Sequence, residues 1–378
     1  MIVKPLTEFC TLNMGQSPDS RTYNDQGNGI PFYQGNADFG EIHPKTRVWC
    51  STPVKIAEPG DILISVRAPI GAMNMAVERC CIGRGLAALT PISEKCGTQF
   101  LYYALQSKVE SLIAQGTGST FKAISKKVLE ATLIPAYSTR EQEHITATIS
   151  HVDCAIAARR NQLVLLDQLV KSRFIELFGD PLLDDGRYPK VPLGTLAEVG
   201  SSKRIFEKEY VTEGVPFYRT KEIVELSKGS RITTELFITR ERYDEIRDEY
   251  GIPQQGDLLI SAVGTIGVIW IVDGKNDFYF KDGNLLRVTA TEKFAPTYLK
   301  HLLEALIGAY KQEMSSGTAY AALTISALKE MPVYVVPITE QKQFTAFVEQ
   351  TDKSKLAVQK GLQELELLKK SLMQQYFG

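Results

Sequence analysis

The feature that most constrains this chain is a stretch that occurs twice. Residues 118–179 align with residues 317–378 at a constant offset of 199, without a gap. Both copies carry Glu-Gln, at 141–142 in the first copy, and both end in Phe-Gly, at 178–179 in the first copy. The period is far longer than that of a solenoid repeat, so it indicates that a whole domain was duplicated together with a helix.

Composition and charge bound the class of protein. The chain has 378 residues, 44% hydrophobic and 23% charged, which is typical of a globular protein with two or more domains. It has no apolar run long enough to span a bilayer, and its first residues, MIVKPLTEFC, lack the features of a secretion signal, so we expect a cytoplasmic protein without membrane contact. The net charge of −1 does not indicate a nucleic-acid partner, and any DNA-binding surface must therefore be local.

The cysteines give no sign of a disulfide framework or a metal site. None forms a CxxC pair, and we expect buried or incidental free thiols in a reducing cytosol. The six are Cys10, Cys50, Cys80, Cys81, Cys96 and Cys154.

Two β-rich segments precede the repeated stretch. The motif Gly-Ile-Pro-Phe-Tyr at 29–33 recurs as Gly-Val-Pro-Phe-Tyr at 214–218, and Gly-Asp-Ile-Leu-Ile-Ser at 60–65 recurs as Gly-Asp-Leu-Leu-Ile-Ser at 256–261. These motifs predict short strands that follow turns. The offset grows from 185 to 196 to 199 along the segment, so the strands are shared while the loops differ in length, chiefly in the Arg- and Glu-rich residues 226–250.

A long helix is predicted at the end of each copy. The first begins after Thr139, an expected N-cap with Gln142 three residues later, and runs to about Leu177. At ~1.5 Å per residue it spans roughly 57 Å. Its apolar residues alternate at spacings of four and three, which is typical of a coiled-coil seam with Arg159 and Arg173 in the two missing slots. The seam consists of Ile145, Ile149, Val152, Ile156, Leu163, Leu166, Val170 and Leu177.

The second helix begins near Thr339 and has a less regular seam. Antiparallel pairing of the two helices is the simplest arrangement, and the alternative is that each helix packs separately on its own domain. The second seam consists of Phe344, Val348, Thr351, Lys355, Val358, Leu362, Leu365, Lys369, Leu372 and Tyr376.

Motifs of catalysis are missing from the sequence. There is no GxxxxGK[ST] phosphate loop, no GxGxxG turn, no HExxH and no [DN]PP[FY] of the kind that holds a flipped adenine. His43, His144, His151 and His301 have no ligand spacing and are expected to be solvated or interface residues. The sequence therefore predicts a binding subunit that is not an enzyme and holds no metal.

Together, these motifs resemble the specificity subunit of a Type I restriction–modification system. They are the G-[IV]-P-F-Y and G-D-[IL]-L-I-S strands, the G-[ST]-x-[FY] loop, the E-Q helix start and the K-S…F-G helix end. The resemblance implies an α+β fold with two β-rich target recognition domains, each followed by a long α-helix. The helices would pair as an antiparallel coiled coil with internal pseudo-twofold symmetry. The expected segments are 1–138 and 180–338 for the domains and 139–179 and 339–378 for the spacer helices.

The resemblance also implies partners. The chain would recognise double-stranded DNA with a bipartite target, and its helices would dock two modification (methyltransferase) subunits. Those subunits, rather than this chain, would carry S-adenosylmethionine and the methyl-transfer chemistry, and restriction/translocase subunits would join for cleavage. Two readers held by a stiff rod would suit half-sites about one helical turn, roughly 34 Å, apart.

Candidate DNA-reading residues are polar side chains in loops between strands, because Arg and Lys pair with guanine and Asn and Gln with adenine. For Tyr33 and Tyr218, core packing is an equal alternative to DNA contact. The first-domain candidates are Tyr33, Gln34, Asn36, Arg67, Arg84, Ser119, Thr120 and Lys122. The second-domain candidates are Lys203, Arg204, Tyr218, Arg219, Lys221, Lys281, Asn284, Thr318 and Tyr320.

Two other classes of protein stay open from the sequence. One is a tandem coiled-coil adaptor that scaffolds proteins without binding DNA, which the near-neutral charge favours slightly. The other is an enzyme, such as a single-chain methyltransferase fused to this module, and the missing cofactor motifs argue against it.

Overall fold

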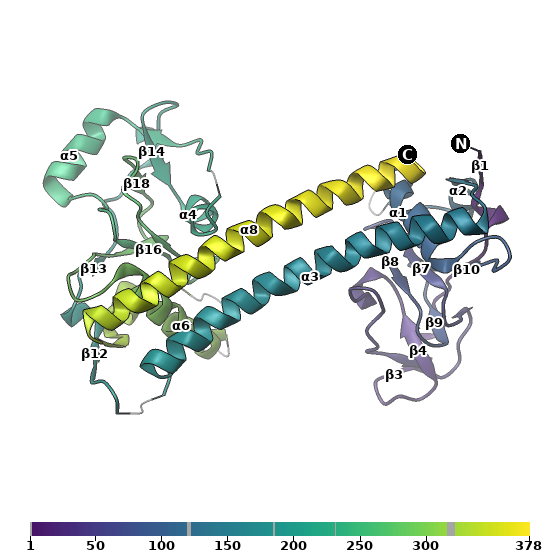
Figure 1. Ribbon diagram of the computed structural model, residues 1–378, viewed down its shortest axis with the longest axis horizontal. Helices are drawn as coiled ribbons and strands as arrows, with labels where there is room; N and C mark the ends of the chain where they lie inside the picture. Colours follow the sequence, from purple (N-terminus) through teal and green to yellow (C-terminus); the bar gives the residue numbers. More distant parts are fainter. Residues whose placement is uncertain (1, 119–121, 184–185, 231, 316–321) are drawn as a thin grey trace. The chain divides into compact units, whose positions relative to one another are not determined.

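The computed structural model describes residues 2–118, 122–183, 186–230, 232–315 and 322–378 (Figure 1). The chain divides into two compact units: unit 1 comprises Met1–Asn161 and Gln359–Gly378, and unit 2 comprises Gln162–Val358. The division falls inside both long helices rather than at their ends. Each unit therefore contains a β-rich domain, the start of the helix that follows it and the end of the other long helix.

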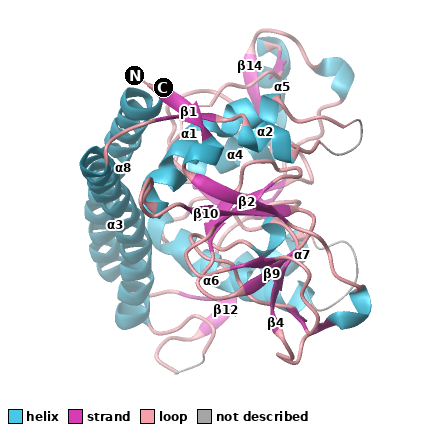
Figure 2. Cartoon of the chain, turned by 90° about the vertical axis from the view of Figure 1, so that its right-hand side faces the viewer, coloured by secondary structure: helices cyan, strands magenta, loops and turns pink. Residues whose placement is uncertain are grey.

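Unit 1 contains an antiparallel sheet, a mixed sheet and a terminal strand pair. The antiparallel sheet has the order β2-β10-β7-β8, and the mixed sheet has the order β3-β5-β4-β9-β6, in which β4 and β9 are parallel. Figure 2 shows β2 and β10 side by side. The strands are β1 (Val3–Pro5), β2 (Cys10–Met14), β3 (Tyr23–Asn24), β4 (Ile30–Tyr33), β5 (Trp49–Cys50), β6 (Ile56–Ala57), β7 (Ile62–Ser65), β8 (Met73–Met75), β9 (Cys80–Ile82), β10 (Leu86–Pro91) and β11 (Leu133–Pro135).

Helices cover the antiparallel sheet of unit 1. The helix α1 (Thr98–Ala114) buries the apolar face that its spacing predicts, from Phe100 to Leu112, against the core that includes β7 and β10. The short helix α2 (Lys126–Glu130) follows, and α3 (Thr139–Phe178) begins after β11. Ile145 and Ile149, at the start of the α3 seam, belong to this core.

Unit 2 repeats this topology, as the sequence duplication predicts. Its antiparallel sheet has the order β13-β19-β16-β17, and β14 pairs with β18 in parallel as β4 does with β9. The strands are β12 (Lys190–Pro192), β13 (Val199–Gly200), β14 (Val215–Tyr218), β15 (Phe237–Ile238), β16 (Leu258–Ser261), β17 (Ile269–Ile271), β18 (Tyr279–Phe280), β19 (Leu285–Val288) and β20 (Pro332–Tyr334). The helices are α4 (Thr220–Ser227), α5 (Arg240–Tyr250), α6 (Pro296–Ser315), α7 (Ile325–Glu330) and α8 (Ile338–Phe377).

The N-cap of α3 differs from the prediction. The backbone N–H and the hydroxyl of Ser138 both donate to Glu141 Oε2, at 2.8 and 2.6 Å. Ser138, rather than Thr139, is therefore the N-cap. Ser138 and Glu141 form a capping box, and the helix begins at Thr139, one residue after the cap.

The glutamine of the repeated Glu-Gln has a structural role that is the same in both copies. Gln142 is 3% exposed, accepts a hydrogen bond from the Gly97 N–H and donates to the carbonyls of Lys95 and Tyr137. Gln341 is 0% exposed and makes the equivalent three bonds, with Ala295, Lys293 and Val336. Each buried amide thus ties the start of a long helix to the loop before α1 or α6.

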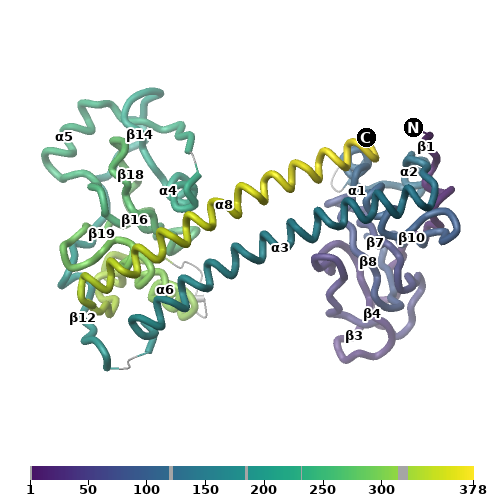
Figure 3. Tube along the Cα trace, viewed as in Figure 1, coloured from purple at the N-terminus to yellow at the C-terminus, as the bar shows by residue number. Residues whose placement is uncertain are grey.

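The Phe-Gly at the end of each copy anchors a helix in a core. Phe178, the last residue of α3, lies in the core of unit 2, with its ring 5.0 Å from that of Tyr298. Phe377, the last residue of α8, lies in the core of unit 1, 5.4 Å from the ring of Phe100. Figure 3 traces α8 to this end. Gly179 has φ +85°, a conformation that favours glycine and stops the helix.

The two long helices contact each other within each unit, and they run in opposite directions. In unit 1, Asp153 pairs with Lys369 at 2.7 Å and Arg160 with Glu366 at 2.8 Å. In unit 2, Asp167 pairs with Lys355 at 2.8 Å, and the rings of Phe174 and Phe344 lie 5.3 Å apart. Every residue of both predicted seams is buried or half-buried. These contacts agree with the antiparallel coiled coil, and the helix ends also pack on the domains.

Candidate nucleic-acid interface

A parallel strand pair positions the candidate residues of the first domain. Phe32 and Tyr33 of β4 lie opposite Cys81 and Ile82 of β9. Because parallel strands end at the same edge of a sheet, the segments that follow β4 and β9 emerge together. The N–H of Gly83 donates to the carbonyl of Tyr33 at 2.8 Å and holds these two loops side by side.

Two glycines bring Arg84 next to Gln34. A Cβ at Gly83 would lie 3.0 Å from Gln34 Cα, and a Cβ at Gly85 would collide with the carbonyl oxygen of Gln34. Only residues without a side chain allow this approach, so the Gly-Arg-Gly sequence places an exposed guanidinium beside an exposed amide.

These residues line a pocket of about 220 Å³ that brings together four of the eight first-domain candidates. Arg67 joins from the loop after β7, and the carbonyl of the exposed Lys122 accepts a hydrogen bond from Ala68 at 3.0 Å, which places Lys122 beside this loop. None of the described residues that line the pocket is acidic. The lining residues are Gln34, Gly35, Asn36, Ser65, Arg67, Ala68, Arg84 and Gly85.

The nearby carboxylate of Asp38 stabilises the loop that follows β4. Asp38 Oδ2 accepts the Gln34 N–H at 2.8 Å, and its Oδ1 pairs with Arg47 at 2.6 Å. The acid is thus used for a turn and an ion pair. The pocket combines two amides with two guanidinium groups, the side chains that make bidentate contacts with adenine and guanine.

The second domain builds the same edge with other side chains. Phe217 and Tyr218 of β14 lie opposite Tyr279 and Phe280 of β18, and the Lys281 N–H donates to the Tyr218 carbonyl at 2.8 Å. Arg219 therefore occupies the place that Gln34 has in the first domain. The loop 281–284 has one residue more than the loop 83–85 and replaces the glycines with Lys281 and Asn284.

Acidic partners accompany the basic candidates of the second domain. Arg219 pairs with Glu222 at 3.3 Å, and Arg204 pairs with Asp282 at 2.8 Å. Lys281 lies 3.6 Å from the same Asp282. The two domains thus present different charge patterns at equivalent edges.

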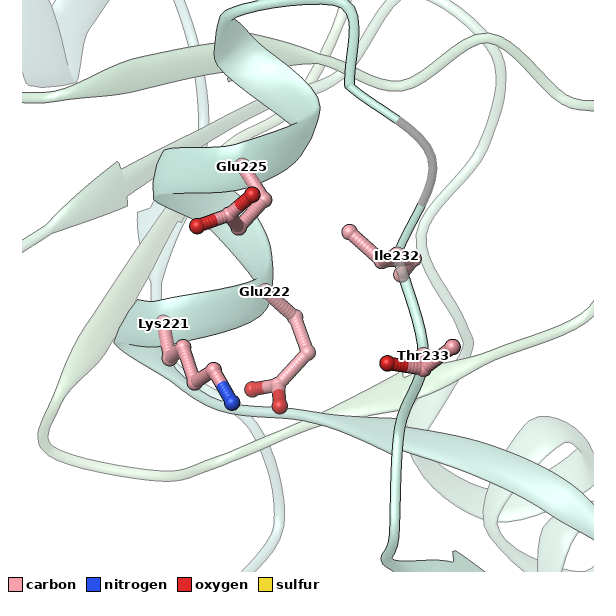
Figure 4. Close-up of a pocket in the computed structure, with 5 residues that line it drawn as sticks. All are labelled: Lys221, Glu222, Glu225, Ile232 and Thr233. Carbon is pink, nitrogen blue, oxygen red and sulfur yellow. The ribbon is translucent and has the colours of Figure 1, made fainter. Parts of the chain in front are cut away.

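The remaining described candidates of the second domain are more scattered. Lys203 Nζ lies 4.5 Å from the centre of the Tyr250 ring, a cation–π contact. Asn284 is exposed, and its carbonyl accepts the Ala262 N–H. Lys221 lines a pocket of about 160 Å³ beside Glu222 and Glu225 (Figure 4).

Two of the candidates are core residues. Tyr33 is 2% exposed and packs in a core of unit 1, while Tyr218 is 7% exposed and stacks on Phe278 at 4.7 Å. Direct DNA contact by these rings is therefore the wrong interpretation, and core packing, the alternative, describes both. Four further candidates, Ser119, Thr120, Thr318 and Tyr320, lie outside the described residues.

The sequence did not single out Glu222, the carboxylate that holds Arg219. Its signal was present in the sequence, because an acid three residues after the residue that precedes a helix forms a capping box. The Arg-rich stretch 226–250 includes α5, and the three arginines of α5 are all engaged with acids. The pairs are Arg240–Asp277, Arg242–Glu209, Arg242–Glu245, Arg247–Asp244 and Arg247–Asp248.

The cysteine thiols differ in chemical character from these polar residues. Five cysteines are buried and free, and Cys154 is exposed. Burial raises the pKa of Cys10, Cys80 and Cys96 to about 12, so these thiols stay protonated and unreactive near neutral pH. Within the described parts of the chain, no helix combines the length and apolar character needed to cross a membrane.

The chain is a tandem of two β-rich domains, each with a polar strand edge and each followed by a long helix. This architecture indicates the class of protein to which the chain belongs. The family model for the Type I restriction modification DNA specificity domain matches residues 1–166 and 187–367. The chain belongs to this family. The family predicted from the sequence is therefore confirmed, together with the α+β fold of two β-rich domains and long helices.

Individual relatives agree with this assignment. A type I restriction enzyme specificity subunit of Methanocaldococcus jannaschii, MjaX, is 42% identical over 167 residues, which are 43% of this chain and 39% of that protein. The specificity subunit S.HindORF215P of Haemophilus influenzae is 25% identical over 368 residues, 95% of this chain and 89% of that one. The match to the MjaX protein thus spans less than half of that protein's length.

A solved structure shares the fold over the whole chain. The crystal structure of the S subunit of a Type-I restriction-modification system from M. genitalium covers 100% of this chain and 96% of that chain. The TM-score is 0.56 at 17% sequence identity, so the likeness concerns the fold.

Proposed function

We propose that this chain is the DNA sequence-recognition subunit of a Type I restriction–modification complex, in which each β-rich domain reads one half of a bipartite double-stranded site. One observation carries the proposal. The same strand edge occurs in both units, and it presents Gln34 and Arg84 in one but Arg219 and Lys281 in the other. Two copies of one fold with different polar side chains at the same strand edge suit the recognition of two unlike half-sites.

The local charge supports DNA as the ligand despite the net charge of −1. The first-domain pocket gathers Arg67 and Arg84 with Lys122 nearby, and its described lining holds no acid. Sequence-independent affinity for DNA comes from contacts between basic side chains and phosphates, so a concentrated patch matters more than the total.

The helices would serve as a spacer and as a docking surface for modification subunits. Both helices expose large apolar side chains away from their seam, for example Leu165 on α3 at 53% and Leu367 on α8 at 68%. Exposed apolar side chains on a helix are typical of surfaces that bind other proteins. Two modification subunits would supply S-adenosylmethionine and methyl transfer, restriction/translocase subunits would add cleavage, and the complex would act in the cytoplasm.

Methylation mapping tests the proposal. The chain is co-expressed with the methyltransferase encoded beside its gene, recognised by an N-P-P-[FY] motif, and the host genome is sequenced by a method that detects methylated bases. We expect one bipartite motif with two unlike half-sites. The same methyltransferase expressed without this chain is the control and should leave the motif unmethylated.

Two outcomes would contradict the proposal. A motif that is methylated equally without this chain would remove its role in recognition. Co-purification with the methyltransferase in the absence of any methylated motif or DNA binding would favour the adaptor class instead.

A further inference from the structure

One structural position carries a different base-reading side chain in each domain. Gln34 directly follows β4, and Arg219 directly follows β14, which are equivalent strands. Both residues precede a helical turn whose third residue is acidic, Asp38 after Gln34 and Glu222 after Arg219. Asp38 Oδ2 and Glu222 Oε2 accept the backbone N–H of Gln34 and Arg219, both at 2.8 Å, although Gly35 lies between Gln34 and its helical turn whereas Arg219 directly precedes α4.

The guanidinium of Arg219 is held in place from one side. Glu222 is 2% exposed, and its Oε1 accepts from Arg219 Nη2 at 3.3 Å while Oε2 accepts the Arg219 backbone N–H. A buried carboxylate that accepts hydrogen bonds from both the backbone N–H and the guanidinium of one arginine fixes the direction of that side chain before any ligand binds.

Part of Arg219 is left available for a ligand. Its side chain is 40% exposed, and Glu222 is its only acidic partner among the described residues. The adjacent Arg219 Nε and Thr220 Oγ1 are buried without a hydrogen-bond partner in the described structure. Since Glu222 occupies one terminal nitrogen, the outward N–H groups of Nη1 and Nη2 remain as a pair of parallel donors.

A pair of parallel guanidinium donors matches the O6 and N7 acceptors of guanine, whereas a glutamine amide matches N7 and N6 of adenine. We propose that Arg219, positioned by Glu222, reads a guanine in one half-site, and that Gln34 reads an adenine at the equivalent place in the other. This assignment rests on the proposed function, because it presumes that both strand edges face DNA.

The test exchanges the two side chains in the complete complex. Arg219→Gln and Gln34→Arg variants are each co-expressed with the methyltransferase, and the methylated motifs are mapped. Arg219→Gln should change the preferred base from guanine to adenine, or lower the guanine preference on the order of tenfold or more, at one position of one half-site. Gln34→Arg should do the converse in the other half-site.

Glu222 acts through Arg219 and is tested as a positioning residue. Glu222→Gln should lower the preference for guanine at the position that Arg219 controls and leave the rest of the motif unchanged, and Glu222→Asp should restore part of it. Glu225→Gln is the matched control, because Glu225 lines the same pocket without a contact to the Arg219 guanidinium. It should leave the motif as in the wild type.

The outcomes separate this inference from the proposed function. If the wild type methylates a bipartite motif and Arg219→Gln leaves every position unchanged, the inference fails while the proposed function stands. If Arg219→Gln abolishes methylation, Arg219→Met, which keeps the aliphatic stem and removes the donors, decides: full retention of guanine selectivity would overturn reading by the guanidinium, and loss of selectivity at one position would support it. Absence of a motif in the wild type would overturn both.

Discussion

At the scale of single residues, the buried glutamines of the repeat matter more than their sequence suggests. Gln142 and Gln341 each connect the start of a long helix to the loop before α1 or α6. Among the described hydrogen bonds, no other side chain at these helix starts bonds to that loop. Both amides use their donor and acceptor atoms fully within the protein. This explains why a glutamine recurs at the same position of both copies.

Gln142→Ala and Gln341→Ala should each destabilise the fold by ~3 kcal/mol, because each change removes three hydrogen bonds between a buried amide and backbone groups. Denaturant unfolding of the complex or of the isolated chain measures this loss. Gln168→Ala and Gln350→Ala, at exposed positions of the same helices, are the controls and should change stability by less than about 0.5 kcal/mol. Equal effects at the buried and exposed sites would refute the role assigned to the amides.

At the scale of elements, patterns of consecutive residues predicted the helices and strands that such patterns determine. The spacing of Ile145, Ile149 and their successors gave the long helix and its buried face, since periodicity is a property of consecutive residues. The Gly-Asp turns before β7 and β16 gave two of the central strands in the same way.

Contacts between distant segments could not be predicted from such patterns. Arg84 and Gln34 are 50 positions apart and meet because β4 and β9 are parallel. The ion pair between Arg204 and Asp282 joins residues 78 positions apart, so the sequence pattern does not show that this arginine has an acidic partner. Phe32 and Tyr33 are consecutive and both buried, in different core clusters, so the burial of Tyr33 depends on segments that the sequence pattern does not identify.

The end of α8 should depend on one side chain. Phe377→Ala removes a fully buried ring from the core of unit 1 and should cost ~3–5 kcal/mol in that unit. Lys108 Nζ and the Tyr137 hydroxyl would also lose their hold on the last carbonyls of the helix. Hydrogen exchange should therefore speed up in the last turns of α8. Leu367→Ala, at an exposed position of the same helix, should leave exchange there unchanged; similar exchange in both variants would contradict the anchoring.

At the scale of the whole molecule, each duplicated helix belongs to both units. Each long helix begins at its own domain and ends in the core of the other unit. An insertion at the junction after Phe178 would displace that buried ring, so a change of helix length belongs where the units divide, after Asn161 and after Val358. Seven residues added at both places keep the seam in register, because the seam repeats every seven residues.

Mapping the methylated motif of this doubly extended chain tests the central claim most directly. Seven residues lengthen a helix by roughly 10 Å, and base pairs are spaced by about 3.4 Å, so the unread spacer should grow by up to about three base pairs while both half-sites stay the same. The same seven residues inserted in the exposed loop at Lys275 are the control and should leave the spacer as it is. A spacer of unchanged length in the doubly extended chain would contradict an account in which two readers are held at a distance set by the helices.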